Sequence, residues 1–389
     1  MKAVVWHGKE DVRVDNVPDP IIQEPTDAII RITSTAVCGS DLHLYSKLSP
    51  IMRSGDIIGH EPMGIVEEVG SGVSHIQPGD RVVIPFNISC GSCFFCDMDL
   101  YSQCETTRDT GKLAEAASLL GRGKGASLFG YTHVYGAVPG GQAEYLRVPQ
   151  AHFGPIKVPE GPPDERFLYL SDVLPTAWQA VAYADTPPGG TLGVWGLGPI
   201  GQMCARIAMQ QGVERVIGVD TVPERLSLAA KYGVETVDFN AVDRVRDVVL
   251  DLTGGRGVDA AIDAVGMEAD GSVMGSILQA AKVQLDRATA LRECMASVRR
   301  GGTISISGVY AGPIQAFQLG DLFDMQIQVR MGQANVRRWT DDIMPLLTDE
   351  DPLGTSDLKT HEMPLEEAPR AYDIFQKKLD GAIKCVLKP

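Results

Sequence analysis

The chain of 389 residues has no long hydrophobic run and a deficit of positive charge. No apolar stretch approaches the ~20 residues that a membrane-spanning helix requires, so we expect no membrane segment. Lys and Arg together number 35 against 50 Asp and Glu, which gives a formal net charge of −15. Such a surface repels phosphate backbones and anionic lipids, and this argues against nucleic-acid and membrane partners.

The sequence also lacks the features of a secreted, disulfide-bonded protein. Residues 1–10 become polar too early for a signal peptide, and we therefore expect a cytoplasmic protein. The eight cysteines do not have the spread of a disulfide framework, because four of them crowd between Cys90 and Cys104. The other four stand alone at Cys38, Cys204, Cys294 and Cys385. In a cytosolic chain, clustered thiols indicate a metal site.

The length exceeds that of one ordinary hydrophobic core, so we expect two domains. Short β-rich stretches separated by turns, such as 28–32 and 64–69, predict an antiparallel barrel or sandwich in residues 1–165. From about Thr191 strands and helices alternate, which predicts a doubly wound parallel α/β sheet in a second domain of residues 166–330. Residues 331–389 are irregular and are expected to return to the first domain. The expected strands of the second domain are 192–195, 215–219, 259–263, 303–307 and 327–330, and its expected helices are 200–211 and 224–232.

A glycine motif lies between the first strand and the first helix of the second domain. Gly196, Gly198 and Gly201 fit G-x-G-x-x-G, and Asp220 closes the next strand. Alone the pattern could be a chance glycine turn, but this context is typical of a dinucleotide site, where backbone N–H groups approach a pyrophosphate. The carboxylate of Asp220 can bind ribose hydroxyls and would repel a 2′-phosphate, and the nearest basic residue is Arg225. We therefore expect NAD rather than NADP.

The crowded thiols form the pattern C-x2-C-x2-C-x7-C, given by Cys90, Cys93, Cys96 and Cys104. Four thiolates on a compact loop match a closed, tetrahedral structural zinc site. The alternatives without a metal are a redox pair and a cluster of buried free thiols. Burying four free thiols in such a polar loop would stabilise the fold very little. An iron–sulfur cluster is the alternative, although the last spacing and the absence of a following proline weigh against it.

A second, dispersed metal site is suggested by Cys38 in a segment ending at His43, and by His60 followed by Glu61. A thiolate and an imidazole need a third ligand, which would come from far downstream. Taken alone, each residue has an ordinary structural explanation, since a single Cys is usually a small buried hydrophobe.

Taken together, these motifs resemble the medium-chain, zinc-containing alcohol dehydrogenase family along the whole chain. Cys38-Gly-Ser-Asp-Leu-His43, Gly59-His60-Glu61-Pro62, the four cysteines and the glycine motif occur in the family's order. The stretches 129–136, 140–145 and 301–310 resemble the glutathione-independent formaldehyde dehydrogenase branch. The resemblance implies a GroES-like barrel and a Rossmann domain.

The resemblance also implies roles for individual residues. Cys38, His60 and Asp172 would bind the catalytic zinc, with Asp172 replacing the Cys of many relatives; a helix N-cap is the alternative for Asp172. Glu61 matches the family's carboxylate near the zinc, which is a transient zinc ligand. Phe86 matches a residue that forms an apolar wall of the family's substrate pocket. Catalytic roles fall to Ser40 and His43, which relay the substrate proton, and to Asp41, which orients His60. The expected cofactor contacts are Gly39, Ser40, His43, Thr176, Gly196, Gly198, Pro199, Ile200, Gly201, Asp220, Arg225, Val265, Gly308 and Val309.

The expected reaction is hydride transfer between NAD and a small alcohol or aldehyde hydrate, with one catalytic and one structural zinc per chain. A dismutation, in which NAD stays bound, is a variant of it. The alternatives are a polyol or L-threonine dehydrogenase of the same family and a non-catalytic NAD-binding redox sensor. The stretch 105–125 resembles an insertion that covers the adenine end of NAD, or it is a flexible surface loop. Relatives are homodimers or homotetramers, and the same is expected here.

Overall fold

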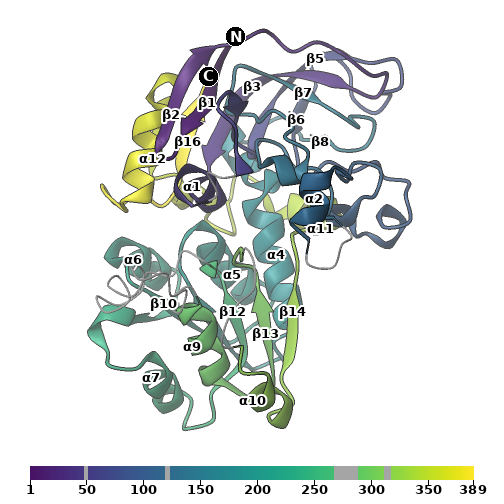
Figure 1. The fold of residues 1–389 in the computed structure, drawn as a ribbon. Coiled ribbons are helices and arrows are strands. Elements are labelled where there is room, and N and C mark those ends of the chain that lie inside the picture. The colour runs from purple at the N-terminus through teal and green to yellow at the C-terminus, as the bar shows by residue number, and fades with distance from the viewer. Residues whose placement is uncertain (48–50, 119–122, 267–287, 311–316) are drawn as a thin grey trace. The chain divides into compact units, whose positions relative to one another are not determined.

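The computed structural model describes residues 1–47, 51–118, 123–266, 288–310 and 317–389 (Figure 1). Its contacts divide the chain into two compact units. The first unit comprises Met1–Pro175 and Ala334–Pro389, and the second comprises Thr176–Gln333. Each unit has its own sheets and its own hydrophobic core.

The first unit is built on antiparallel strands. Its larger sheet has the order β15-β16-β3-β5-β6-β8, with β7 also paired to β3, and a smaller sheet has the order β2-β1-β4. Alternate residues of the long strand β3, such as Ile30 and Ile32, are buried in a core with Val66 and Leu146. β-Branched side chains of this kind favour a pleated, half-buried surface. The strands are β1 (Lys2–Gly8), β2 (Asp11–Asn16), β3 (Ala28–Val37), β4 (Asp56–Ile57), β5 (Pro62–Val69), β6 (Arg81–Val83), β7 (Tyr145–Val148), β8 (Ile156–Lys157), β15 (His361–Pro364) and β16 (Cys385–Lys388).

The C-terminal part of the chain completes this sheet. Strand β16 pairs antiparallel with the last residues of β3, with Cys385 opposite Val37. Lys384 therefore lies next to the point where β3 leads into Cys38. The helices of the first unit are α1 (Gly39–Ser46), α2 (Lys112–Ala116), α3 (Asp164–Leu168), α11 (Val336–Ile343) and α12 (Ala368–Gln376).

The second unit contains a six-stranded sheet of order β11-β10-β9-β12-β13-β14, in which every pairing is parallel. Its strands are β9 (Thr191–Trp195), β10 (Arg215–Asp220), β11 (Glu235–Asp238), β12 (Val258–Asp263), β13 (Val298–Ile306) and β14 (Gln328–Met331). The intervening helices are α5 (Pro199–Gln210), α6 (Pro223–Lys231), α7 (Val245–Leu252), α9 (Thr289–Ser297) and α10 (Leu319–Asp324), and α4 (Val173–Ala184) leads into the unit. The central strands are apolar and buried, as parallel strands require. This arrangement confirms the predicted doubly wound α/β sheet.

The predicted elements of the second unit match the observed ones to within one or two residues, with one exception. Strand β13 begins at Val298, five residues before the predicted start. Gly301, which lies within this strand, adopts a positive φ of 68°. The strand nevertheless continues through it, because Val298 pairs with Val258 before the register shifts. None of the helices in the described part of the chain combines the length and the hydropathy needed to cross a membrane.

Candidate metal and cofactor sites

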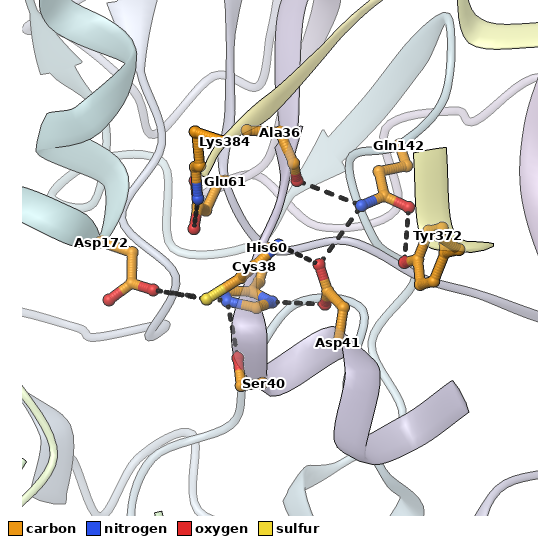
Figure 2. Close-up of polar contacts among 10 residues, drawn as sticks. All are labelled: Ala36, Cys38, Ser40, Asp41, His60, Glu61, Gln142, Asp172, Tyr372 and Lys384. Atoms are coloured by element: carbon orange, nitrogen blue, oxygen red, sulfur yellow. Dashed lines mark hydrogen bonds and ion pairs between the residues drawn. The ribbon is translucent and has the colours of Figure 1, made fainter. Parts of the chain in front are cut away.

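Four potential metal ligands from distant parts of the first unit meet at one buried point (Figure 2). Cys38 lies between β3 and α1, and His60 and Glu61 directly precede β5. Asp172 directly precedes helix α4. All four residues are buried, and one ligand atom of each lies within 4.8 Å of those of the others.

The side chains of Cys38, His60 and Asp172 point toward one another in this cluster. The Cys38 thiol donates to Asp172 Oδ2 at 3.4 Å, and His60 Nε2 lies 3.5 Å from the same oxygen. The hydroxyl of Ser40, in the first turn of α1, lies 3.2 Å from His60 Nε2. His43 follows Ser40 by one turn on the same helix and is buried.

Asp41 connects two of the ligand residues. Its Oδ1 lies 2.9 Å from His60 Nδ1, and its Oδ2 accepts the Cys38 backbone N–H at 2.9 Å. This contact directs Nε2 of the ring to Cys38 and Asp172, as expected for a metal-ligating imidazole. Burial alone would lower the pKa of His60, but the carboxylates of Asp41 and Asp172 outweigh it and raise that pKa well above its usual value. A metal ion therefore competes with a proton at Nε2.

A further layer of hydrogen bonds extends from Asp41 to the C-terminal helix (Figure 2). The Gln142 amide nitrogen donates to Asp41 Oδ2 at 3.3 Å and to the Ala36 carbonyl at 3.1 Å. Two acceptors at this nitrogen fix the orientation of the amide. The amide oxygen then accepts the hydroxyl of Tyr372, on α12, at 2.9 Å. All members of this chain are buried.

Lys384, which directly precedes strand β16, also lies at this cluster. Its Nζ lies 2.6 Å from Glu61 Oε1, and neither side chain exposes any surface. Burial alone would lower the pKa of Lys384, but the Glu61 carboxylate outweighs it and raises that pKa. The second Glu61 oxygen, Oε2, is buried and has no hydrogen-bond partner among the described residues.

These observations fit a zinc ion. Burial, together with the carboxylates of Glu61 and Asp172, raises the pKa of the Cys38 thiol to about 11. A cation at this point would reverse that effect and give the orphaned Glu61 oxygen a counter-charge. Sulfur, imidazole nitrogen and carboxylate oxygen form a donor set that zinc accepts.

The four-cysteine lobe forms a second cluster. The Sγ atom of Cys93 lies 3.5 Å from that of Cys96 and 3.9 Å from that of Cys104, and all four sulfurs, that of Cys90 included, lie within 4.8 Å of one another. Sulfurs on one tetrahedral zinc lie about 3.8 Å apart, given Zn–S bonds of ~2.3 Å, so the spacing fits a single ion rather than a multi-iron cluster. Burial alone would raise the pKa of Cys93, but the backbone N–H groups of Cys96 and Glu105 outweigh it and lower that pKa to about 6. The lobe thus favours the thiolate form of Cys93, which is the form that binds a metal ion.

Aromatic rings border the cluster of Cys38, His60, Glu61 and Asp172. The ring centroid of Phe86 lies 6.2 Å from that of His60, edge-on, and that of Tyr131 lies 6.5 Å away. Phe86 is held by its backbone N–H, which donates to the Ser171 carbonyl beside Asp172. The space next to the cluster is therefore bounded by apolar surface.

The glycine motif of the second unit forms the turn between β9 and α5. Gly196 has a φ of 88°, and a Cβ atom on Gly201 would lie 1.8 Å from the Gly196 carbonyl oxygen, so both positions require glycine. Gly198 caps α5, with Pro199 and Ile200 in the first turn. A Cβ atom on Gly198 would meet only Arg225, at 3.8 Å, which leaves the backbone open to a ligand.

Asp220, at the end of β10, accepts the Leu197 N–H of this turn at 2.6 Å and the N–H groups of Thr221 and Val222. An Arg225 guanidinium nitrogen lies 3.9 Å from Asp220 Oδ2, and the buried Nε of Arg225 has no hydrogen-bond partner among the described residues. A carboxylate at the strand end, a free guanidinium nitrogen and an open helix N-terminus fit a dinucleotide.

The remaining predicted cofactor residues lie partly in the first unit and partly in the second. Gly39 opens α1 in the first unit, and Thr176 lies in α4, which begins directly after Asp172. In the second unit, Val265 follows β12, while Gly308 and Val309 follow β13. The predicted insertion contains α2, but its residues 119–122 lie outside the described part of the chain. Its role over the cofactor stays a prediction.

Comparisons with known proteins show the family to which the chain belongs. Residues 24–160 match the family model described as "Alcohol dehydrogenase GroES-like domain", and residues 199–284 match "Zinc-binding dehydrogenase". An uncharacterized zinc-type alcohol dehydrogenase-like protein of Bacillus subtilis is 42% identical over 392 residues, which cover 100% of both chains. The chain belongs to the zinc-type alcohol dehydrogenase family. An alcohol dehydrogenase structure from Thermus sp. ATN1 has a TM-score of 0.82 at 33% identity, covering 100% of this chain and 99% of that one.

Formaldehyde dismutase of Pseudomonas putida is 32% identical over 400 residues, which cover 97% of this chain and 95% of that protein.

Sequence reasoning missed several residues that surround the two sites in this family member. Gln142 lies in a stretch whose sequence shows only a family resemblance, and Tyr372 and Lys384 lie in the irregular C-terminal segment. Their contacts with residues more than 200 positions away left no local signal in the sequence. Asp263 gave only a weak signal, because it is a carboxylate that ends strand β12 directly after the apolar residues 260–262.

Proposed function

We propose that this chain is a zinc-dependent oxidoreductase that transfers a hydride between NAD and a small alcohol or aldehyde hydrate. The observation that carries the proposal is the convergence of Cys38, His60 and Asp172 at one buried point, because a mixed thiolate, imidazole and carboxylate set is typical of a catalytic zinc. A bound zinc supplies Lewis acidity, and NAD supplies the hydride acceptor.

The chain's own groups would handle the proton that leaves with the hydride. Ser40 Oγ faces the ligand cluster and accepts the proton of the substrate hydroxyl, and His43, one turn further along α1, passes it toward solvent. Asp41 keeps the His60 ring in place through its contact with Nδ1. One hydride and one proton thus leave the alcohol, and a carbonyl compound remains.

The boundaries of the cluster favour a small substrate. Phe86 and Tyr131 flank the His60 ring and would exclude water as well as bulky groups. Within this class, formaldehyde hydrate is our preferred substrate, since a formaldehyde dismutase is 32% identical over nearly the whole chain. Dismutation, which yields formate and methanol from two formaldehyde molecules, is the second candidate for the same reason.

We propose NAD rather than NADP as the cofactor because Asp220 places a carboxylate beside the glycine turn. We also propose a homodimer or homotetramer. The exposed side chains of Leu319 and Phe323 on α10 and of Met331 on the edge strand β14 support self-association of the second unit, because such apolar surface is costly in water.

The test is the absorbance of NADH at zinc saturation with formaldehyde, ethanol, a secondary alcohol, sorbitol and L-threonine offered separately. We expect formaldehyde to be oxidised without glutathione. Formate and methanol formation without added NAD would identify dismutation, and preference for sorbitol or L-threonine would point to the alternative dehydrogenases. Absence of turnover with every substrate, while zinc and NADH are bound, would favour a redox sensor. Ser40→Ala is the matched variant, and it should lose turnover while retaining zinc.

A further inference from the structure

The topology of the second unit determines where a dinucleotide would extend. From β9 the chain moves outward to β10 and β11, and then crosses to β12, β13 and β14 on the other side. Ligands of doubly wound sheets bind at this switch point, outside the carboxyl ends of the strands. With Asp220 on the β10 side next to the adenosine half, the nicotinamide half must lie toward the loops that follow β12 and β13.

One buried carboxylate organises both of these loops. Asp263, the last residue of β12, exposes no surface. Its Oδ1 accepts the N–H groups of Val265 at 3.0 Å and Gly266 at 3.1 Å, and its Oδ2 accepts the Tyr310 hydroxyl at 2.5 Å. Its backbone carbonyl accepts the N–H groups of residues 307 and 308. Five donors from segments 264–266 and 307–310 therefore meet at a single residue.

The two segments cross with their backbones in direct contact. A Cβ atom on Gly308 would lie 2.2 Å from the Gly266 nitrogen, and one on Gly266 would lie 2.5 Å from the Val309 nitrogen. The glycine turn joins the same assembly, since a Cβ atom on Gly196 would lie 2.6 Å from the Val265 side chain. The position of each loop is thus set by the others, and the Asp263–Tyr310 bond is the side-chain link between them.

One face of this assembly is exposed among the described residues. The Val309 side chain is 40% exposed although it is apolar, whereas Asp263 is buried and Tyr310 packs against the core of the sheet. Burial raises the pKa of Asp263, while the hydrogen bonds from Tyr310, Val265 and Gly266 act in the opposite direction. The carboxylate thus depends on these donors, and losing one of them leaves a buried oxygen unsatisfied.

We propose that Asp263 and Tyr310 are positioning residues that hold segments 264–266 and 307–310 in the arrangement that binds the nicotinamide half of NAD. This inference rests on the proposed function, because it assumes that the chain binds NAD. Tyr310 acts through Asp263 and the two loops, not by touching the reacting atoms.

The test compares full-length, zinc-loaded wild type with Tyr310→Phe by titration with NADH and with ADP-ribose, which lacks nicotinamide. The phenyl ring keeps its packing in the core, so only the hydroxyl bond is lost. We expect the dissociation constant for NADH to rise about tenfold, because a hydrogen bond to a charged group contributes on this scale, and that for ADP-ribose to stay within about twofold. Tyr232→Phe, in which the ring lies under Arg206 at the end of α6, is the matched control and should change neither constant.

Two results would overturn the proposal. Equal weakening of both ligands would show a general loss of the cofactor unit, and unchanged binding of both would show that the bond does not position the loops. Asp263→Asn is the second variant and should reproduce the selective loss of NADH affinity. If wild type binds ADP-ribose and NADH with no difference between them, the loops do not contact nicotinamide. If wild type binds neither ligand, the proposed NAD linkage itself fails, which is a distinguishable outcome.

Discussion

The Nζ of Lys384 lies 2.6 Å from the Oε1 of Glu61, with both side chains fully buried beside the predicted catalytic metal ligands. Lys384 comes from the segment that precedes β16, and Glu61 directly follows the ligand His60. The pair thus connects the segment before β16 to the group of candidate metal ligands. Buried ion pairs of this kind add little net stability over apolar residues, but breaking one leaves an uncompensated charge.

Replacement of Lys384 by Met should destabilise the protein strongly. The Glu61 carboxylate would stay buried without its cation, and such losses cost about 3–5 kcal/mol. Urea denaturation of protein freed of zinc by a chelator measures the effect, because a bound zinc would itself supply a counter-charge to Glu61. Lys388→Met is the control, because Lys388 pairs with Glu165 near the surface and its loss should cost about 1 kcal/mol. Equal stability of the two variants would show that the buried pair has no special role.

Gln142→Leu should weaken zinc retention at the catalytic cluster. The amide holds Asp41, which in turn contacts His60 and the backbone of Cys38. Loss of groups that orient metal ligands typically costs ten- to a hundredfold in affinity, and Gln142 acts one contact further away. We therefore expect one of the two zinc ions to transfer to a chromogenic chelator about three- to tenfold faster.

Tyr372→Phe provides the comparison for that experiment. It removes only the hydroxyl that donates to the Gln142 amide oxygen and leaves both bonds of the amide nitrogen intact. Its zinc release should lie between those of wild type and Gln142→Leu. Wild-type release from Gln142→Leu would rule out a role for this hydrogen-bond chain in holding the metal.

Asp220→Ser should reduce the preference for NAD over NADP. The carboxylate at the end of β10 would no longer repel a 2′-phosphate, and Arg225, now 3.9 Å from Asp220, would be free to pair with it. We expect the affinity for NADH to fall about tenfold and that for NADPH to rise. Fluorescence titration with both nucleotides measures this. A wild type that binds NADPH as tightly as NADH would contradict the assignment of Asp220.

The ion pair between Glu165 and Lys388 predicts a pH-dependent contribution to stability. Burial alone would raise the pKa of Glu165, but the hydrogen bond from Lys388 outweighs it and lowers that pKa from 4.5 to about 2. Because the folded-state value lies below the unfolded-state value, the ionised form stabilises the fold above about pH 4.5, and this contribution is lost as the pH falls toward 2.

Glu165→Gln should accordingly cost about 1 kcal/mol above pH 5, after allowance for the partial exposure of Lys388. The difference in urea midpoint between variant and wild type should shrink below pH 4. Loss of zinc in acid affects both proteins alike and cancels in this difference. A difference that grows toward acid pH would have the wrong sign for this ion pair.

Much of the fold could be predicted because local patterns determine it. Strand and helix alternation between residues 191 and 331 predicted the parallel sheet, and short β-rich stretches predicted the antiparallel one; both are confirmed. The start of β13 was predicted five residues too late, because its first residues are held by pairing of Val298 with Val258 in β12, which the local sequence does not reveal.

The candidate sites were predictable only in part. Spacing alone pointed to the four-cysteine lobe and to the glycine turn, because their residues are close in sequence. Asp172 was predicted only from the family resemblance, because it lies so far from Cys38 in the sequence that no spacing motif connects the two residues. Gln142, Tyr372 and Lys384 could not be found from either source, because their roles depend on how β16 and α12 pack against β3 and the metal cluster.

The most direct test of the central claim is the zinc content and NADH production of Asp172→Ala, measured beside wild type with formaldehyde as substrate. We predict two zinc ions per chain in wild type and one in the variant, with loss of NADH production but retention of NADH binding. Asp172→Cys, which restores a ligand, should regain the second zinc. Two zinc ions and undiminished activity in Asp172→Ala would contradict the assignment of Cys38, His60 and Asp172 as the catalytic metal site.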